Sequence, residues 1–171
     1  MHRSPWHFHL TIDDLNNQLA PWQQFQAEVA ACTYKELRST AQLLMLLSRQ
    51  QALKHVAHEF IIVRLQMSPL YSFLIEHERE YVVKIAEICA YLQHLTQYFA
   101  NMHQSLHLHA LHARELPAPS FSIVLELMAN VQEVHGWVAE QLQQNLMAIR
   151  RHYPAQHPAI SALVDAILHP A

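Results

Sequence analysis

Residues 68–106 read SPLYSFLIEHEREYVVKIAEICAYLQHLTQYFANMHQSL, and the pattern of this stretch decides the fold. Its apolar side chains recur every three or four positions, which places them along one stripe of an α-helix of about ten turns, roughly 60 Å long. Charged residues such as Glu80 and Lys84 lie on the opposite face. Ser68 followed by Pro69 is typical of a helix start, because the serine side chain caps the helix and proline has no amide hydrogen to leave unbonded. The stretch therefore predicts one long helix with a coiled-coil-like seam.

The same helical spacing continues before this stretch. Apolar residues recur mostly at steps of three and four from Leu15 to Leu65, and residues 41–47 (AQLLMLL) are apolar on nearly every side. Pro21 falls inside this pattern, where it either begins a helical segment or kinks a continuous one. Residues 59–65 (EFIIVRL) contain β-branched side chains that suit a strand, but their flanks are helical and no partner strand is evident, so a helix is favoured.

After the central stretch, Pro117 and Pro119 interrupt the chain, and Ser120 is placed to cap another long amphipathic helix. A short final helix is expected over Ala159 to Leu168. The predicted fold is all-α: an antiparallel bundle of three to four long amphipathic helices plus a short C-terminal helix. Residues 11–171 are expected to form this single domain, after an irregular lead-in over residues 1–10.

The chain of 171 residues contains one glycine, Gly136. Phosphate-binding loops, nucleophile elbows and dinucleotide-binding turns need glycines at fixed positions, so these nucleotide-binding and catalytic motifs are excluded. Gly136 itself lies inside a predicted helix, where we expect it to permit a close approach of a neighbouring helix.

Composition bounds the remaining classes of function. The formal net charge is −3 and no cluster of lysine and arginine is present, so nucleic acid is not an expected partner. No apolar run reaches the roughly 18 residues of a membrane span, and the first residues do not resemble a signal peptide. Cys32 and Cys89 are expected to be small buried side chains in a reducing compartment. These features predict a soluble cytoplasmic protein.

The 15 histidines are the first candidates for chemistry. His103 and His107 are four positions apart, and His109 and His112 are three apart, so each pair shares one side of a helix. The two pairs point in different directions and have no interleaved carboxylate, whereas a metal site needs three or four converging ligands. No pairing of cysteine, serine or carboxylate with a general base is evident either. We therefore expect no metal, no cofactor and no enzymatic activity.

The helices contain more apolar side chains than one helix–helix seam can bury. This excess predicts an interaction surface and a homo-oligomer. The residues predicted to form this surface are Leu43, Leu44, Leu46, Leu47, Phe60, Ile61, Ile62, Tyr81, Ile85, Ile88 and Leu92.

Four segments between Leu19 and about Leu95 resemble the phasins, bacterial proteins that coat polyhydroxyalkanoate granules. The segments are LAPWQQFQAEV (19–29), TYKELRSTAQLL (33–44), SRQQALKHVAHEF (48–60) and EREYVVKIAEI (78–88). The resemblance implies a non-catalytic protein that coats a hydrophobic granule surface with amphipathic helices and associates with itself. It implies no role for any individual residue.

A helical adaptor or chaperone-like module is the alternative. Such a module binds a helix of a partner protein in a groove of its own bundle. Adsorption to droplets would favour the coat, and a stoichiometric complex with one protein would favour the adaptor.

Overall fold

The computed structural model describes residues 12–32, 39–61, 75–112 and 120–170, with the side chains of 75–78 and 109–112 left out. The described residues contain five helices and no strand: α1 (Ile12–Ala30), α3 (Thr40–His58), α4 (Ile75–His112), α5 (Ser120–His152) and α6 (His157–Leu168). Four of these helices are long and the last is short, so the predicted all-α bundle is confirmed. The predicted lead-in over residues 1–10 and the predicted helix start at Ser68 and Pro69 lie outside the described residues.

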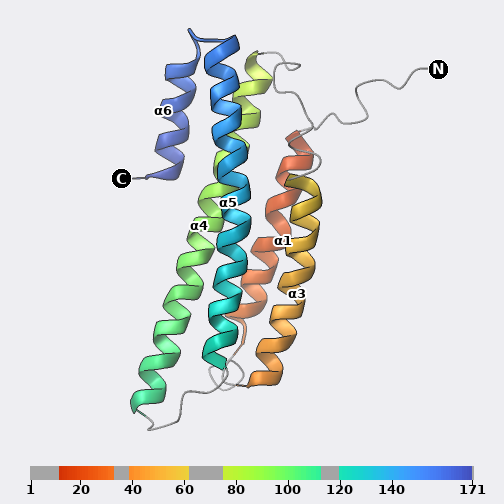
Figure 1. Cartoon of the computed structure of the whole chain (residues 1–171), viewed down its shortest axis with the longest axis vertical. Helices are drawn as coiled ribbons and strands as arrows, with labels where there is room; N and C mark the ends of the chain where they lie inside the picture. Colours follow the sequence, from red (N-terminus) through yellow and green to blue (C-terminus); the bar gives the residue numbers. More distant parts are fainter. Residues whose placement is uncertain (1–11, 33–38, 62–74, 113–119, 171) are drawn as a thin grey trace, which may run out of the picture.

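The long helices run alternately down and up the bundle (Figure 1). α4 and α5 form the most extensive antiparallel pair, α1 packs on α4, α3 packs on α5, and α1 and α3 touch each other. The order around the bundle is therefore α1, α3, α5, α4, with α6 folded back onto α4 and α5. Two helical hairpins thus lie side by side with their corresponding helices parallel.

One continuous core lies between these helices. The stripe of α4 is buried at most positions between Tyr81 and Leu106, with Tyr81, Ile85, Leu95 and Phe99 completely enclosed. The ring of Phe99 contacts that of Phe25 from α1, with centroids 6.2 Å apart. The seam predicted from the sequence is therefore covered by other helices of the same chain.

The structure resolves one alternative that the sequence left open, and it differs from the sequence pattern at one helix boundary. α1 continues through Pro21 without a break, because the apolar stripe on both sides of the proline packs on the same core. The chain instead breaks between Ala30 and Thr40, where the apolar periodicity suggested continuity. Ser39 marks the new start, since its hydroxyl accepts a hydrogen bond of 3.4 Å from the amide of Gln42.

Other boundaries agree with the sequence. Residues 59–61 continue α3 as a π-helical turn, so the helical interpretation of the EFIIVRL segment is confirmed as far as Ile61. α5 begins at Ser120, as predicted. α6 begins at His157, two positions before the predicted start, because Pro158 fits the first turn of a helix.

The expectation for Gly136 is wrong. Gly136 is exposed, and a Cβ atom at this position would meet nothing within 4 Å. No neighbouring helix in the described part of the chain needs the absence of a side chain here.

The predicted interaction surface is also corrected. Its members Leu43, Leu46, Leu47, Phe60, Ile61, Tyr81, Ile85, Ile88 and Leu92 are all buried in the core. Only Leu44 is exposed, at 50%, and Ile62 lies outside the described residues. These apolar side chains exceed what one helix–helix seam can bury, but each long helix packs against two others, and the second contact covers them.

Candidate functional site

An open groove runs along the outer junction of α3 and α5. It has a volume of about 510 Å³. We call it the α3/α5 groove and define it by its lining residues: Gln51, Lys54, His55, His58, Glu59, Glu133 and Trp137.

Lys54 is the central charge of the groove. Its Nζ atom lies 2.6 Å from Oε2 of Glu133 and donates a hydrogen bond of 3.2 Å to Oδ1 of Asn130. The same ammonium stands 5.9 Å from the ring centroid of Trp137, within the range of a cation–π interaction. The side chain of Glu133 is 53% exposed, so water screens the ion pair and its net contribution to stability is small. These contacts restrict the position of the Lys54 side chain.

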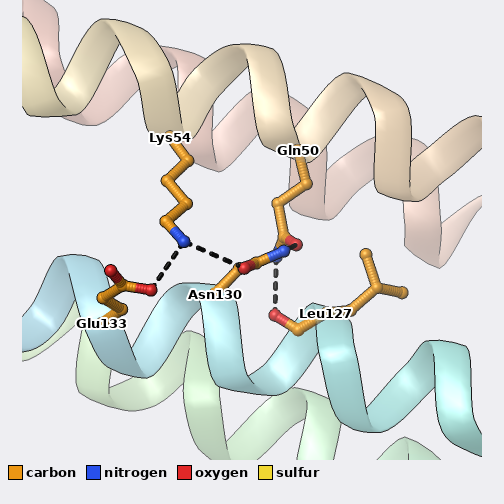
Figure 2. A network of polar contacts seen from close by, with 5 residues as sticks. All are labelled: Gln50, Lys54, Leu127, Asn130 and Glu133. Atoms are coloured by element: carbon orange, nitrogen blue, oxygen red, sulfur yellow. Dashed lines mark hydrogen bonds and ion pairs between the residues drawn. The ribbon is translucent and has the colours of Figure 1, made fainter.

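A chain of amide groups next to the groove joins α3 to α5 (Figure 2). Gln50 is completely buried, and its Nε2 atom donates a hydrogen bond of 2.7 Å to the carbonyl oxygen of Leu127. Its Oε1 atom accepts a hydrogen bond of 3.0 Å from Nδ2 of Asn130, whose own oxygen accepts from Lys54. Both ends of the buried amide are satisfied, so the network sets the position of α3 along α5.

Trp137 gives the groove an aromatic wall. Its indole is partly exposed, and the ring of His58 meets it edge-on with centroids 5.3 Å apart and an interplanar angle of 78°. The exposed side chains of His55 and Glu59 form the rim. The groove therefore combines a half-covered aromatic surface with charges of both signs.

The groove contains five titratable side chains: Lys54, His55, His58, Glu59 and Glu133. Its titratable groups include no cysteine, and the part of the chain with described side chains contains no group of three or more histidine, cysteine or carboxylate side chains that could hold a metal ion. The sequence pattern singled out none of Lys54, Glu133 and Trp137. A usable signal was Gln50, a polar residue inside the buried stripe that contains Leu43, Leu46 and Leu47.

The predicted histidine pair of His103 and His107 serves packing. Both rings contact Phe121 at the start of α5, with centroid distances of 5.9 and 5.8 Å. The structure does not describe the side chains of His109 and His112. The two histidines near the C-terminal end of α4 thus contact the beginning of α5.

Cys89 and His135 form a second polar contact, between α4 and α5. The Sγ atom of Cys89 lies 3.4 Å from Nε2 of His135. Burial raises the pKa of the Cys89 thiol to about 11 and lowers the pKa of His135. Both groups are therefore neutral at pH 7, and Cys89 is an inert buried thiol as expected, not a nucleophile. Cys32 is only half-buried, because it lies at the end of α1.

Few large apolar side chains are exposed among the described residues. Three of them belong to α3: Leu44, Met45 and Val56. A smaller groove of about 270 Å³ lies between α1 and α3, where Arg49 pairs with Glu28 at 2.5 Å above an apolar floor that includes Phe25. Both of these grooves thus use α3 as a wall.

No match was found. Comparisons of the chain with protein-family models, with curated proteins and with solved structures found no similar protein. No helix in the described part of the chain has the length and apolar character needed to cross a membrane.

Proposed function

We propose that this protein is a non-catalytic helical module that binds a partner polypeptide in the α3/α5 groove. The observation that carries the proposal is the combination of a half-exposed tryptophan, Trp137, with an open groove between two packed helices. Tryptophan is enriched among the side chains that dominate the binding energy of protein interfaces, and charged residues belong to their rims.

The groove is preorganised for binding. The buried Gln50 amide fixes α3 against α5, and Lys54 is held by Glu133 and Asn130. Because the side chains are ordered before the partner arrives, association loses less conformational entropy. The groove suits a segment with an aromatic anchor and a basic residue, since its two carboxylates, Glu59 and Glu133, outnumber the one ammonium group of Lys54 and both glutamate side chains are exposed.

Affinity capture with wild-type and variant proteins tests this proposal. Trp137→Ala should weaken a groove-bound partner by about 2 kcal/mol, or roughly 30-fold in Kd. Met147→Ala is the matched control, because Met147 is exposed on the same helix outside the groove. Partners that bind wild type and Trp137→Ala equally would refute the groove as the binding site.

A coat on a hydrophobic granule, the role that the phasin resemblance implies, is the second proposal. The observation that favours it is the set of exposed apolar side chains on α3, which includes Met45 and Val56. Self-association through the same face belongs to this proposal.

Flotation with polyhydroxyalkanoate or lipid droplets tests the coat. We expect wild type to float with the droplets and Met45→Glu/Val56→Glu to stay in solution. Recovery of both proteins in the soluble fraction would refute the coat and leave the groove proposal untouched.

A further inference from the structure

The groove between α1 and α3 combines one ion pair with an apolar floor. Its volume is about 270 Å³, just below the roughly 300 Å³ at which pockets for drug-sized ligands begin, so an occupant has to be small. The contact between α1 and α3 is the least extensive of the four around the bundle, which leaves this space between them. We call it the α1/α3 groove and define it by its lining residues: Pro21, Gln24, Phe25, Glu28, Arg49, Ala52 and Leu53.

The two ends of the α1/α3 groove differ in character. α1 and α3 run in opposite directions, so Glu28 and Arg49 lie together at one end and Pro21 lies towards the other (Figure 1). Phe25 is one turn from Glu28 on α1, and Leu53 is one turn from Arg49 on α3, so these two apolar side chains come next along the groove. An occupant therefore meets charge at one end and apolar surface beside it.

The ion pair presents both charges to an occupant. Nη2 of Arg49 lies 2.5 Å from Oε1 of Glu28, and no other lining residue is charged. The side chain of Arg49 is 56% exposed and that of Glu28 is 28% exposed. A lone cation is repelled by Arg49 and a lone anion by Glu28, because the two opposite charges cancel much of each other's field. A ligand with a positive and a negative group close together is attracted to both.

Glu28 has an acceptor to spare. A carboxylate accepts hydrogen bonds at both of its oxygens. Oε1 faces Arg49, whereas Oε2 is shielded from water and receives no hydrogen bond from any residue that the structure describes. Such an oxygen destabilises the protein unless a donor reaches it. The last torsion of a glutamate side chain is broad, so a small rotation turns Oε2 towards the groove while Oε1 stays near Arg49.

We infer that the α1/α3 groove binds a free α-amino acid with an apolar side chain of about the size of leucine. Its ammonium group donates to the carboxylate of Glu28, and its carboxylate accepts from the exposed guanidinium of Arg49. Both charged groups of such a ligand are on one carbon atom, so it holds them close together, as the ion pair does. Its side chain lies on the floor that Phe25 and Leu53 form. The α3/α5 groove is on the other side of α3, so this inference goes beyond the proposed function and does not depend on it.

Nuclear magnetic resonance of the full-length protein tests the inference. Added leucine should shift the side-chain amide signals of Gln24 and the backbone amide signal of Leu53, and the shifts should saturate. We expect a Kd on the order of 1 mM, because water screens an ion pair that is open on one side. The indole N–H signal of Trp137 reports on the α3/α5 groove and should stay in place.

Three analogues of leucine remove one feature each. Glycine lacks the apolar side chain. Leucinamide lacks the carboxylate and resembles the first residue of a polypeptide, and N-acetylleucine lacks the ammonium group and resembles the last residue. Each analogue should bind at least several-fold more weakly than leucine. An analogue that binds as tightly as leucine would overturn the inference, and leucinamide or N-acetylleucine would then identify the ligand as a chain terminus.

Variants of the protein locate the site. Glu28→Gln and Arg49→Gln should each raise the Kd for leucine several-fold. Glu133→Gln is the matched control, because it removes the exposed carboxylate of the other ion pair on α3, and it should leave the Kd unchanged. Ala52→Leu adds a larger side chain to the groove from an exposed position, so it should weaken binding in a protein that still folds, whereas Ala52→Ser should not.

Two further results would overturn the inference. One is a leucine titration with no saturable shift at concentrations well above the expected Kd. The other is the same Kd in wild type, Arg49→Gln and Ala52→Leu. Neither result bears on capture of a partner by wild type and its loss in Trp137→Ala, so failure of the amino-acid site and failure of the proposed function are distinguishable.

Discussion

Replacing Gln50 with alanine should destabilise the protein by about 3 kcal/mol. The substitution removes the hydrogen bond to the Leu127 carbonyl and the one from Asn130, and each is worth about 1 kcal/mol net. It also removes a buried methylene group, worth about 0.8 kcal/mol. Gln50 is completely buried, so no water replaces the lost partners.

Gln50→Met separates the polar from the apolar contribution. Methionine fills a similar volume. The Nδ2 group of Asn130 loses its acceptor, but the side chain of Asn130 is partly exposed, so water can replace it. The carbonyl of Leu127 lies inside α5, where the helix supplies a donor. We expect this variant to lose about 1 kcal/mol. Gln51→Ala is the matched control, because Gln51 is exposed and its loss should change stability by less than about 0.5 kcal/mol.

Urea denaturation followed by circular dichroism measures these differences. For a chain of this size, 3 kcal/mol corresponds to a fall in melting temperature of about 6 to 12 °C. A loss below about 1 kcal/mol for Gln50→Ala, or equal losses for Gln50→Ala and Gln51→Ala, would refute the reasoning that the buried amide network holds α3 on α5.

Three further predictions concern the bundle as a whole. Gly136→Ala should raise the free energy of unfolding by about 1 kcal/mol and the melting temperature by about 2 to 4 °C. The reason is that Gly136 is an exposed residue in the interior of α5 with open space around it. A lower melting temperature would contradict this prediction. Ile85→Asp should prevent folding, since an unpaired charge at a completely buried position costs several kcal/mol. Loss of the helical circular dichroism signal measures this effect. Gln93→Asp, at an exposed position of α4, is the control and should fold normally. The pKa of His135 is lowered by burial, so the unfolded chain, which titrates near pH 6.5, binds more protons than the folded one below that value. The contribution of His135 is therefore complete above about pH 6.5 and is lost as the pH falls through the window below it; His135→Gln should flatten this part of the stability profile, and identical profiles for the two proteins would contradict the assignment.

The helical class and the start of α5 follow from local pattern. Steps of three and four between apolar residues reflect the geometry of a single helix, and Ser120 after Pro119 is a local cap signal. The break between Ala30 and Thr40 escaped this reasoning, because the apolar spacing is continuous across it and the capping serine, Ser39, is one polar residue among many.

The candidate site depended on contacts across the fold. Lys54 and Glu133 are separated by 79 positions, and Gln50 and Leu127 by 77. No spacing rule within either helix connects such residues. The other groove residues are close in the sequence, because Gln51, His55, His58 and Glu59 all lie in or next to the last turns of α3.

The sequence by itself determined that the chain folds into amphipathic helices, since the apolar stripe of each helix depends only on the spacing of the residues in that helix. Which helix covers each stripe was decided by the tertiary structure, which sets the order α1, α3, α5, α4 around the core. The amount of apolar surface left for a partner depends on that order, because a side chain such as Leu46 or Ile85 counts as surplus only until a neighbouring helix buries it.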